Sequence, residues 1–385
     1  MFFSHGLAGS RNMYSHICGS VASHGVVVIA MDHRDGSSPM QFVRPTKDTP
    51  EQTIAPITLS HTPSKEVYEG RDRQLRIRMW EIALAHIAML RVDKGWTVEN
   101  LDLNTSSSKK TREDVLSMFK NTLDIHTPGK IIWSGHSFGA QTMHQLVKSV
   151  YYEPQRPASA NKPLITPAKD SFISKQITNA SPLALLDLWG LPQHSPDQAW
   201  LWKLPLPCYT SETPGGRAVI SVLSEGFFNW TGNLNDVKRA ISPPTKYSGP
   251  EPSNFYPARS QHFSQSDFGI LFPTLTSYFK AEEPERVLKL NMRAMLQTFR
   301  RCGIEVSDTS RADMEISDDS SVTKSSDDAA ILSKVSDIRG WMPIPIERRM
   351  SRSSMSTKED EKNMPAEFKA AEEPHIGAVA QAVAT

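Results

Sequence analysis

The chain has 385 residues, of which 43 are Lys or Arg, 42 are Asp or Glu and three are Cys. Its formal net charge of +1 provides no positive field, so we do not expect a nucleic-acid partner. The cysteines, Cys18, Cys208 and Cys302, are widely spaced, which excludes a disulfide framework or a CxxC metal site and favours a reducing, cytoplasmic location. Neither a signal-peptide pattern nor a long apolar run of membrane-spanning length is present, so no targeting or spanning segment is expected.

The first forty residues predict a strand, a turn, a helix and a second strand. Met1–Ser4 is a short apolar run, His5–Ser10 is a glycine-rich turn, and Tyr14–Ser23 is helix-like. Val26–Met31 is a continuous apolar run rich in β-branched residues, which is typical of a strand covered on both faces. This order predicts a βαβ unit and an α/β fold with a mostly parallel central sheet and helices on both faces.

The middle of the chain alternates predicted elements with polar insertions. A helix is expected over Glu66–Val92, where apolar residues recur at helical spacing, and strands over Leu183–Leu188 and Ala218–Leu223. A further helix is expected over Glu285–Arg301, with Pro284 suited to its first turn. Surface insertions are expected near residues 45–65, 104–113 and 153–169.

We therefore expect a catalytic domain over residues 1–306 followed by a tail. Residues 307–385 are rich in Ser, Asp, Lys and Glu and have few large apolar side chains, so most of this segment is expected to be disordered. The exception is residues 338–346, which are apolar enough to dock back onto the domain.

The strongest chemical signal is the motif Gly135-His136-Ser137-Phe138-Gly139. An apolar strand, Lys130–Ser134, precedes it and a predicted helix, Ala140–Tyr152, follows it. A strand, a sharp turn and a helix around GxSxG form a nucleophile elbow, in which flanking glycines permit a strained turn that exposes the serine hydroxyl. We therefore predict that Ser137 is a covalent nucleophile. The alternative is an ordinary serine in a glycine-rich turn, such as a phosphate-binding turn.

A serine nucleophile in this fold needs an acid and a histidine base that follow it in the chain. His144 lies about two helical turns beyond the nucleophile, roughly 10 Å along the axis, and is too far away to take its proton. His262 lies in a polar segment between the last predicted strand and the C-terminal helix, so we predict that it is the base, with His194 as the weaker alternative.

The sequence pattern leaves the acid open. Asp187 and Glu225 each follow an apolar strand-like run and could each face the histidine from the same edge of the sheet. Asp197 and Asp267 are weaker candidates, because the first lies in a proline-flanked loop and the second only five residues beyond His262.

An oxyanion hole in this fold uses the backbone N–H of the residue after the nucleophile, here Phe138, and one from a loop after an earlier strand. The turn His5-Gly6-Leu7-Ala8-Gly9 is suited to provide that loop.

Five blocks together resemble the platelet-activating factor acetylhydrolases of the plasma and intracellular type II group. In chain order they are FSHGLAGSRNMYSHICGSVASHGVVVIAMDHRDGS, GHSFGA, LLDLWGLP, LSEGFFNW and QHFSQSDF. The resemblance implies an α/β-hydrolase that removes the short sn-2 acyl group, typically acetate, from ether and oxidised phospholipids, without a metal or another cofactor. The implied partner is a phospholipid, with transient contact to a lipid surface, and the oligomeric state is not defined.

Carried onto this chain, the family pattern implies the nucleophile at Ser137, the acid at Asp187 rather than Glu225, and the base at His262. It implies oxyanion donors at the backbone amides of Leu7 and Phe138. Family members have a substantial segment before the HGLxG block, so the resemblance also implies a sheet that lacks its N-terminal strands. A generic carboxylesterase or short-chain lipase is the alternative enzyme, and an inactive scaffold is the alternative of another class.

Overall fold

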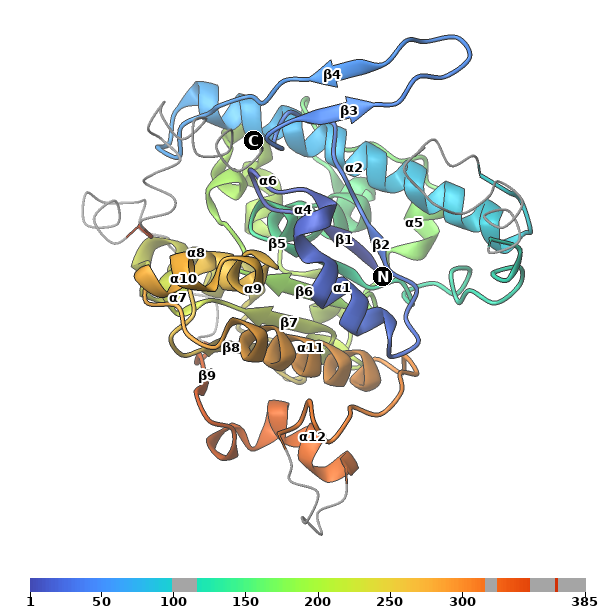
Figure 1. Cartoon of the computed structure of the whole chain (residues 1–385). Helices are drawn as coiled ribbons and strands as arrows, with labels where there is room; N and C mark the ends of the chain where they lie inside the picture. The colour runs from blue at the N-terminus through green and yellow to red at the C-terminus, as the bar shows by residue number, and fades with distance from the viewer. Residues whose placement is uncertain (99–115, 316–323, 347–363, 366–385) are drawn as a thin grey trace.

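The computed structural model describes residues 1–98, 116–315, 324–346 and 364–365. At its centre is a seven-stranded sheet with the order β2-β1-β5-β6-β7-β8-β9 (Figure 1). Neighbouring strands from β2 to β8 run parallel, and β9 is antiparallel to β8. The predicted α/β-hydrolase fold is therefore confirmed.

The strands of the sheet are short and apolar. Their bounds are β1 Phe2–Ser4, β2 Ile29–Ala30, β5 Trp133–His136, β6 Leu183–Leu186, β7 Val219–Val222, β8 Ser253–Pro257 and β9 Trp341–Pro343. A separate antiparallel hairpin, β3 Gln41–Val43 and β4 Gln52–Ile54, projects from the body (Figure 1). Strand β4 lies within the expected insertion at 45–65, whereas β3 precedes it. The expected insertion at 104–113 lies outside the described residues.

One expected strand differs from its prediction. Val26–Met31 was expected to be covered on both faces, but β2 is limited to Ile29–Ala30 and residues 26–30 are only half-buried. The reason is its position, because β2 pairs with β1 alone among the described strands and forms the edge of the sheet. Hydropathy alone does not distinguish an edge strand from a central one.

Helices cover both faces of the sheet (Figure 1). Helices α2 (Lys65–Asp93) and α4 (Phe138–Tyr152) pack on one face, and α1 (Ser15–Ala22) and α11 (Pro284–Arg301) pack on the other. Successive strand residues point to opposite faces, so Phe2 joins the first core and Phe3 the second. The remaining α-helices among the described residues are α5 Phe172–Gln176, α6 Ala199–Lys203, α7 Glu225–Asn229, α8 Thr231–Ile241, α9 Phe268–Leu271, α10 Pro273–Tyr278 and α12 Lys324–Ser333.

Two elements lie within the segment expected to be mostly disordered. Helix α12 packs against α11, and β9 adds the last strand to the sheet. Trp341 of β9 is buried, stacks on Phe255 of β8 at a centroid distance of 5.1 Å, and donates its indole N–H to the Ile331 carbonyl at 2.9 Å. Residues 324–346 are thus tied to the catalytic fold.

None of the described helices combines the length and the apolar character that crossing a bilayer requires.

Candidate active site

Ser137 lies on a sharp turn between a strand and a helix. Strand β5 ends at His136, helix α4 begins at Phe138, and Ser137 between them has φ 57° and ψ −119°. This is a strained conformation for a residue with a side chain, of the kind that costs about 1–3 kcal/mol and that persists at functional sites. The predicted elbow geometry is present.

The flanking glycines make this turn sterically feasible. A Cβ on Gly135 would lie 2.5 Å from the Gly139 carbonyl group. A Cβ on Gly139 would overlap the backbone oxygen of Ser4 in the neighbouring strand β1. Both positions therefore require glycine because backbone, which cannot move aside, occupies the space.

The loop after β1 lies directly beside Ser137. A Cβ on Gly6 would lie 3.1 Å from the Ser137 Cβ, so the absence of a side chain lets the loop approach the nucleophile. Phe138 is the first residue of α4, where a backbone N–H has no partner within the helix. The helix N-terminus also directs its positive dipole end at this point.

A buried carboxylate follows the next strand. Asp187 comes directly after β6, is completely buried and has a positive φ of 44°. Its Oδ1 accepts the Ser224 backbone N–H, and its Oδ2 lies 2.9 Å from His262 Nδ1. The Ser137 N–H donates to the Leu186 carbonyl at 2.8 Å, so the serine and the carboxylate lie at neighbouring strand ends.

His262 follows β8 and is held between two aromatic rings. It stacks on Phe227 with a centroid distance of 4.3 Å and an interplanar angle of 5°, and its ring lies 4.3 Å from that of His136. Because Nδ1 faces Asp187, its Nε2 is the nitrogen available for proton transfer. The structure thus brings Ser137, Asp187 and His262 together at the carboxyl edge of the sheet.

The electrostatics keep Asp187 ionised. Burial alone would raise the pKa of this carboxyl, but the side chains of His136 and His262 more than offset burial and lower its pKa below 3.8. The His136 Nε2 is 3.9 Å from Asp187 Oδ2, beyond hydrogen-bond distance, so we attribute its effect to the dipole of the imidazole ring. At neutral pH the carboxylate is therefore negative.

His136 extends the site in a way that the sequence analysis missed. The Gly6 N–H donates to the Tyr14 hydroxyl at 3.1 Å, and that hydroxyl lies 2.8 Å from His136 Nδ1. Burial and the neighbouring His262 lower the pKa of His136 to about 4, so its ring is neutral. Tyr14 then donates to Nδ1, and Nε2 carries the proton and faces Asp187. The sequence does show a histidine at the variable position of GxSxG. Its hydrogen-bond partner Tyr14, however, is 122 residues away in the chain, so the pairing has no local sequence signal.

The other candidates have different partners. His194 Nε2 pairs with Asp236 at 2.8 Å, and His144 is buried in α4. Asp267 accepts backbone N–H groups at the start of α1, and Asp197 pairs with Lys162. Glu225 accepts the backbone N–H of Arg259 at 2.5 Å and so supports the turn that precedes His262.

Among the described residues, one cluster could also hold a metal ion. The ligand atoms of His136, Asp187 and His262 lie within 4.8 Å of one another, and two histidines with a carboxylate are a known zinc-binding set. However, the hydrogen bond between Asp187 and His262 would have to break before both could bind an ion. The geometry of Asp187 and His262 therefore fits a pair that transfers protons better than it fits a metal site.

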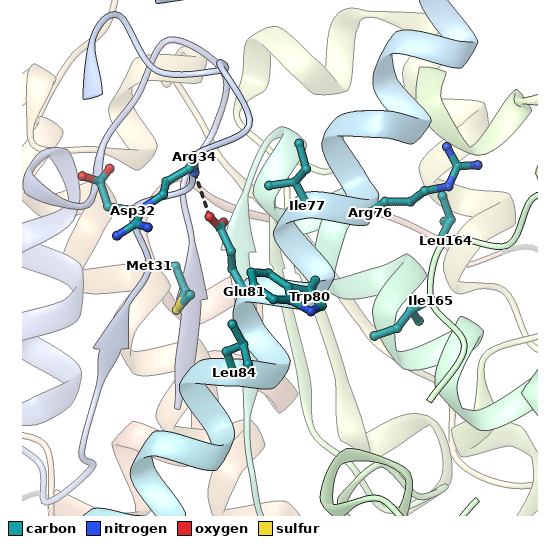
Figure 2. A pocket seen from close by; sticks show the side chains of 10 residues that line it. All are labelled: Met31, Asp32, Arg34, Arg76, Ile77, Trp80, Glu81, Leu84, Leu164 and Ile165. Atoms are coloured by element: carbon teal, nitrogen blue, oxygen red, sulfur yellow. Dashed lines mark hydrogen bonds between the residues drawn. The ribbon is translucent and has the colours of Figure 1, made fainter. Parts of the chain in front are cut away.

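A separate groove lies at the β2 edge of the sheet. It has a volume of about 800 Å³ and is open to solvent beside α2 (Figure 2). Its lining includes none of the candidate catalytic residues; it consists of Met31, Asp32, Arg34, Arg76, Ile77, Trp80, Glu81, Leu84, Leu164 and Ile165.

The amino-acid sequence is similar to those of known proteins. Residues 1–175 match the family described as platelet-activating factor acetylhydrolase, isoform II. A Schizosaccharomyces pombe protein named "Putative phospholipase A2" is 29% identical over 329 residues, covering 79% of this chain and 67% of that protein. Platelet-activating factor acetylhydrolases of Cavia porcellus and Bos taurus are 33% and 34% identical over 149 and 150 residues. These matches cover 38% of this chain, and 30% and 31% of the two acetylhydrolases.

Proposed function

From the match of residues 1–175 to the platelet-activating factor acetylhydrolase, isoform II, family, we propose that the chain hydrolyses the short sn-2 acyl ester of platelet-activating factor-like phospholipids. The relatives support a phospholipid-hydrolysing enzyme in general. The observation that carries the finer proposal is the hydrogen-bonded pair of Asp187 and His262 beside the strained Ser137.

The proposed reaction begins with attack of the Ser137 hydroxyl oxygen on the ester carbonyl carbon while His262 Nε2 takes the hydroxyl proton. Backbone N–H groups of Leu7 and Phe138 stabilise the resulting oxyanion. The tetrahedral intermediate collapses to an acyl-enzyme, and His262 returns the proton to the departing sn-2 oxygen of the lysophospholipid.

Deacylation repeats the same steps with water as the nucleophile. His262 takes a proton from the water that attacks the acyl-enzyme and then gives it to the Ser137 oxygen, which releases a carboxylic acid, acetate in the simplest case. Asp187 holds the imidazole in the required tautomer and stabilises its transient positive charge.

A lipid surface is the proposed source of the substrate. Helices α9 and α10 follow His262 closely in the chain and expose three large apolar side chains, Leu271, Leu275 and Tyr278, the last at 83%. Exposed apolar residues next to a catalytic base suit transient contact with a membrane or micelle.

The direct test measures acetate release by the purified chain from 1-alkyl-2-acetyl-glycerophosphocholine, with Ser137→Ala as the inactive control. We expect activity to fall as the sn-2 chain is lengthened from acetyl to palmitoyl. Equal activity on simple esters without a phosphocholine group would instead favour a generic carboxylesterase or short-chain lipase. A folded wild-type protein that hydrolyses neither class would contradict the proposal and favour a non-catalytic role.

The lipid contact is tested with the double variant Leu271→Ser/Leu275→Ser. We expect weaker binding to phosphatidylcholine vesicles and slower hydrolysis of vesicle-bound substrate, with unchanged hydrolysis of soluble p-nitrophenyl acetate. Met118→Ser is a matched control because Met118 is equally exposed but lies elsewhere. Equal vesicle binding by all three proteins would rule out this surface.

A further inference from the structure

Arg78 is a charged residue in the interior of the protein. It lies on α2, and its side chain is 0% exposed. On the same helix Trp80 is 61% exposed, and Figure 2 shows Arg76, Ile77, Trp80, Glu81 and Leu84 at the open groove. An arginine is almost never fully buried unless it is paired, so the contacts of Arg78 indicate what it does.

The guanidinium group holds the loop that carries Leu7. Its Nη1 donates to the carbonyl of His5 at 2.7 Å, and also to the Ser4 hydroxyl at 3.2 Å. These residues lead directly from β1 into the turn beside Ser137. One side of the oxyanion loop is therefore fixed by a charge-assisted hydrogen bond to its backbone.

The other side of the same loop is held through Ser37. Arg78 Nη2 donates to the Ser37 hydroxyl at 2.5 Å, and the Ser37 carbonyl accepts the Ala8 N–H at 2.7 Å. Ala8 has a positive φ of 54°, a conformation that needs support from its surroundings. Leu7 lies between the two anchored residues, so the direction of its N–H depends on both contacts.

Arg78 also contacts the residue that carries the second donor. The guanidinium carbon lies 4.5 Å from the centre of the Phe138 ring, a cation–π distance. Phe138 is buried, and its N–H is at the start of α4. One side chain thus touches both segments that would form the oxyanion hole.

The buried charge is neutralised locally. Arg78 Nε donates to Asp35 Oδ2 at 2.6 Å, and Asp35 Oδ1 accepts the N–H and hydroxyl of Ser37. Burial would raise the pKa of Asp35, but the charge of Arg78 and the hydrogen bonds from Ser37 and Arg78 together outweigh burial and lower it. Burial and the same charge lower the pKa of His5 to about 3, so that ring stays neutral.

We propose that Arg78 is a positioning residue that aligns the Leu7 and Phe138 N–H groups as an oxyanion hole. This inference rests on the proposed function. Arg78 lies behind the loop and does not meet the substrate; it acts by fixing two donors at their separation before the reaction. Pre-aligned donors stabilise the transition state more than the bound substrate, so their misplacement lowers kcat rather than raising KM.

The test compares Arg78→Met and Arg78→Lys with the double variant Arg78→Met/Asp35→Asn, using p-nitrophenyl acetate as substrate. Arg78→Met leaves Asp35 as an unpaired buried charge and should unfold at a lower temperature, whereas the double variant removes both charges and should recover much of the stability. In the double variant we expect kcat to remain reduced by about 10²-fold, with KM within about threefold of wild type. Arg78→Lys should fall between wild type and Arg78→Met, because a lysine keeps the charge but not the fork of donors.

Arg73→Met is the matched control, since Arg73 is an exposed arginine on the same helix and should keep wild-type kinetics. A double variant with wild-type kcat, or a loss that appears entirely in KM, would overturn the assignment. Failure of the wild-type protein to hydrolyse any ester would instead refute the proposed function itself.

Discussion

The backbone conformation and hydrogen bonds of Asp187 direct its carboxylate toward His262. Its positive φ turns the side chain away from the end of β6 and toward His262, while the Ser224 N–H satisfies the other carboxylate oxygen. Glu225 also follows a strand but bonds to the backbone N–H of Arg259. The sequence pattern could not choose between Asp187 and Glu225 as the acid, but in the structure their carboxylates have different partners.

Replacing Asp187 by Asn should therefore lower kcat far more than replacing Glu225 by Gln. We expect a loss of about 10³–10⁴-fold for Asp187→Asn, because an amide can stabilise the wrong tautomer of His262 and cannot stabilise its positive charge. Glu225→Gln keeps an acceptor for Arg259 and should remain within about threefold of wild type. Steady-state kinetics on a soluble ester would measure both; equal losses would contradict the assignment of the acid.

Individual site residues could be predicted from the sequence only where a motif or the chain order around them is informative. Ser137 and His262 could be proposed because the elbow motif is contiguous and the order of catalytic residues is fixed in this fold. The choice of Asp187 needed the family resemblance, since its φ and its hydrogen bonds belong to the folded chain. The link from Gly6 through Tyr14 to His136 could not be predicted, because it joins residues from separate elements across the sheet edge.

At the scale of elements, the elbow depends on close contact between α4 and β1. Gly139 lies against the backbone of Ser4, and this contact seats the start of the helix on the strand that leads to the oxyanion loop. Gly19 of α1 is a useful contrast, because apart from its chain neighbours and its own helix backbone no atom of the described residues lies within 4 Å of the position that a Cβ would occupy. The same substitution should therefore have opposite effects at these two glycines.

Gly139→Ala should destabilise the protein by about 3 kcal/mol or more, because a methyl group would be forced against backbone. Gly19→Ala should stabilise it by about 0.5–1 kcal/mol, because alanine has the higher helix propensity. Urea unfolding followed by circular dichroism measures both changes. Similar midpoints for the two variants would show that the α4–β1 contact is looser than described.

The C-terminal elements were the part of the fold that sequence patterns described least well. Strand β8 was not predicted, because Ser253, Asn254 and Pro257 weaken its apolar pattern and its burial comes from neighbours on both sides. The apolar segment 338–346 could be singled out for docking from composition. Its antiparallel pairing with β8 could not, because strand pairing over this sequence distance has no local signal.

Trp341→Ala should cost about 3–5 kcal/mol of stability, as expected for removal of a fully buried large aromatic side chain. Met342 is the adjacent control, since its side chain is exposed and Met342→Ala should change stability by less than about 0.5 kcal/mol. Thermal unfolding of both variants would test this expectation. If Trp341→Ala melted with the wild type, β9 would not contribute to the stable sheet.

At the scale of the whole molecule, several histidines are buried in the neutral state. Burial lowers the pKa of His5 to about 3 and those of His86 and His136 to about 4, and it holds that of His33 well below 6.5. In the unfolded chain these groups take up protons near pH 6.5. The unfolded state therefore binds more protons than the native state between pH 6.5 and about 4, and stability falls as the pH is lowered through this window.

Glu81 acts in the opposite direction. Burial raises its pKa to about 7, so between pH 4.5 and 7 the native state holds a proton that the unfolded state has lost. One carboxyl cannot balance four histidines, and we expect a net loss of stability in acid. The melting temperature should fall steeply between pH 6.5 and 4.5; a flat profile would contradict the buried neutral histidines.

A substitution of His86 can measure how much one buried histidine contributes to the pH dependence of stability. Neither of its ring nitrogens has a hydrogen-bond partner among the residues that the structure describes, and its ring meets Phe2 edge-on. His86→Phe removes one group that protonates on unfolding, so its stability relative to wild type should grow by roughly 1.4 kcal/mol per pH unit as the pH falls from 6 to 5. Parallel stability curves for the two proteins over that range would exclude this role.

The central claim is that Ser137 is an activated nucleophile, and covalent labelling tests it most directly. The wild-type protein is treated with a fluorophosphonate, and the modified peptide is identified by mass spectrometry while residual esterase activity is followed. We predict one label per chain, located on Ser137, with activity lost in proportion to labelling, and very slow labelling of His262→Ala. A folded, esterase-active protein that is labelled at another residue, or not at all, would contradict the claim.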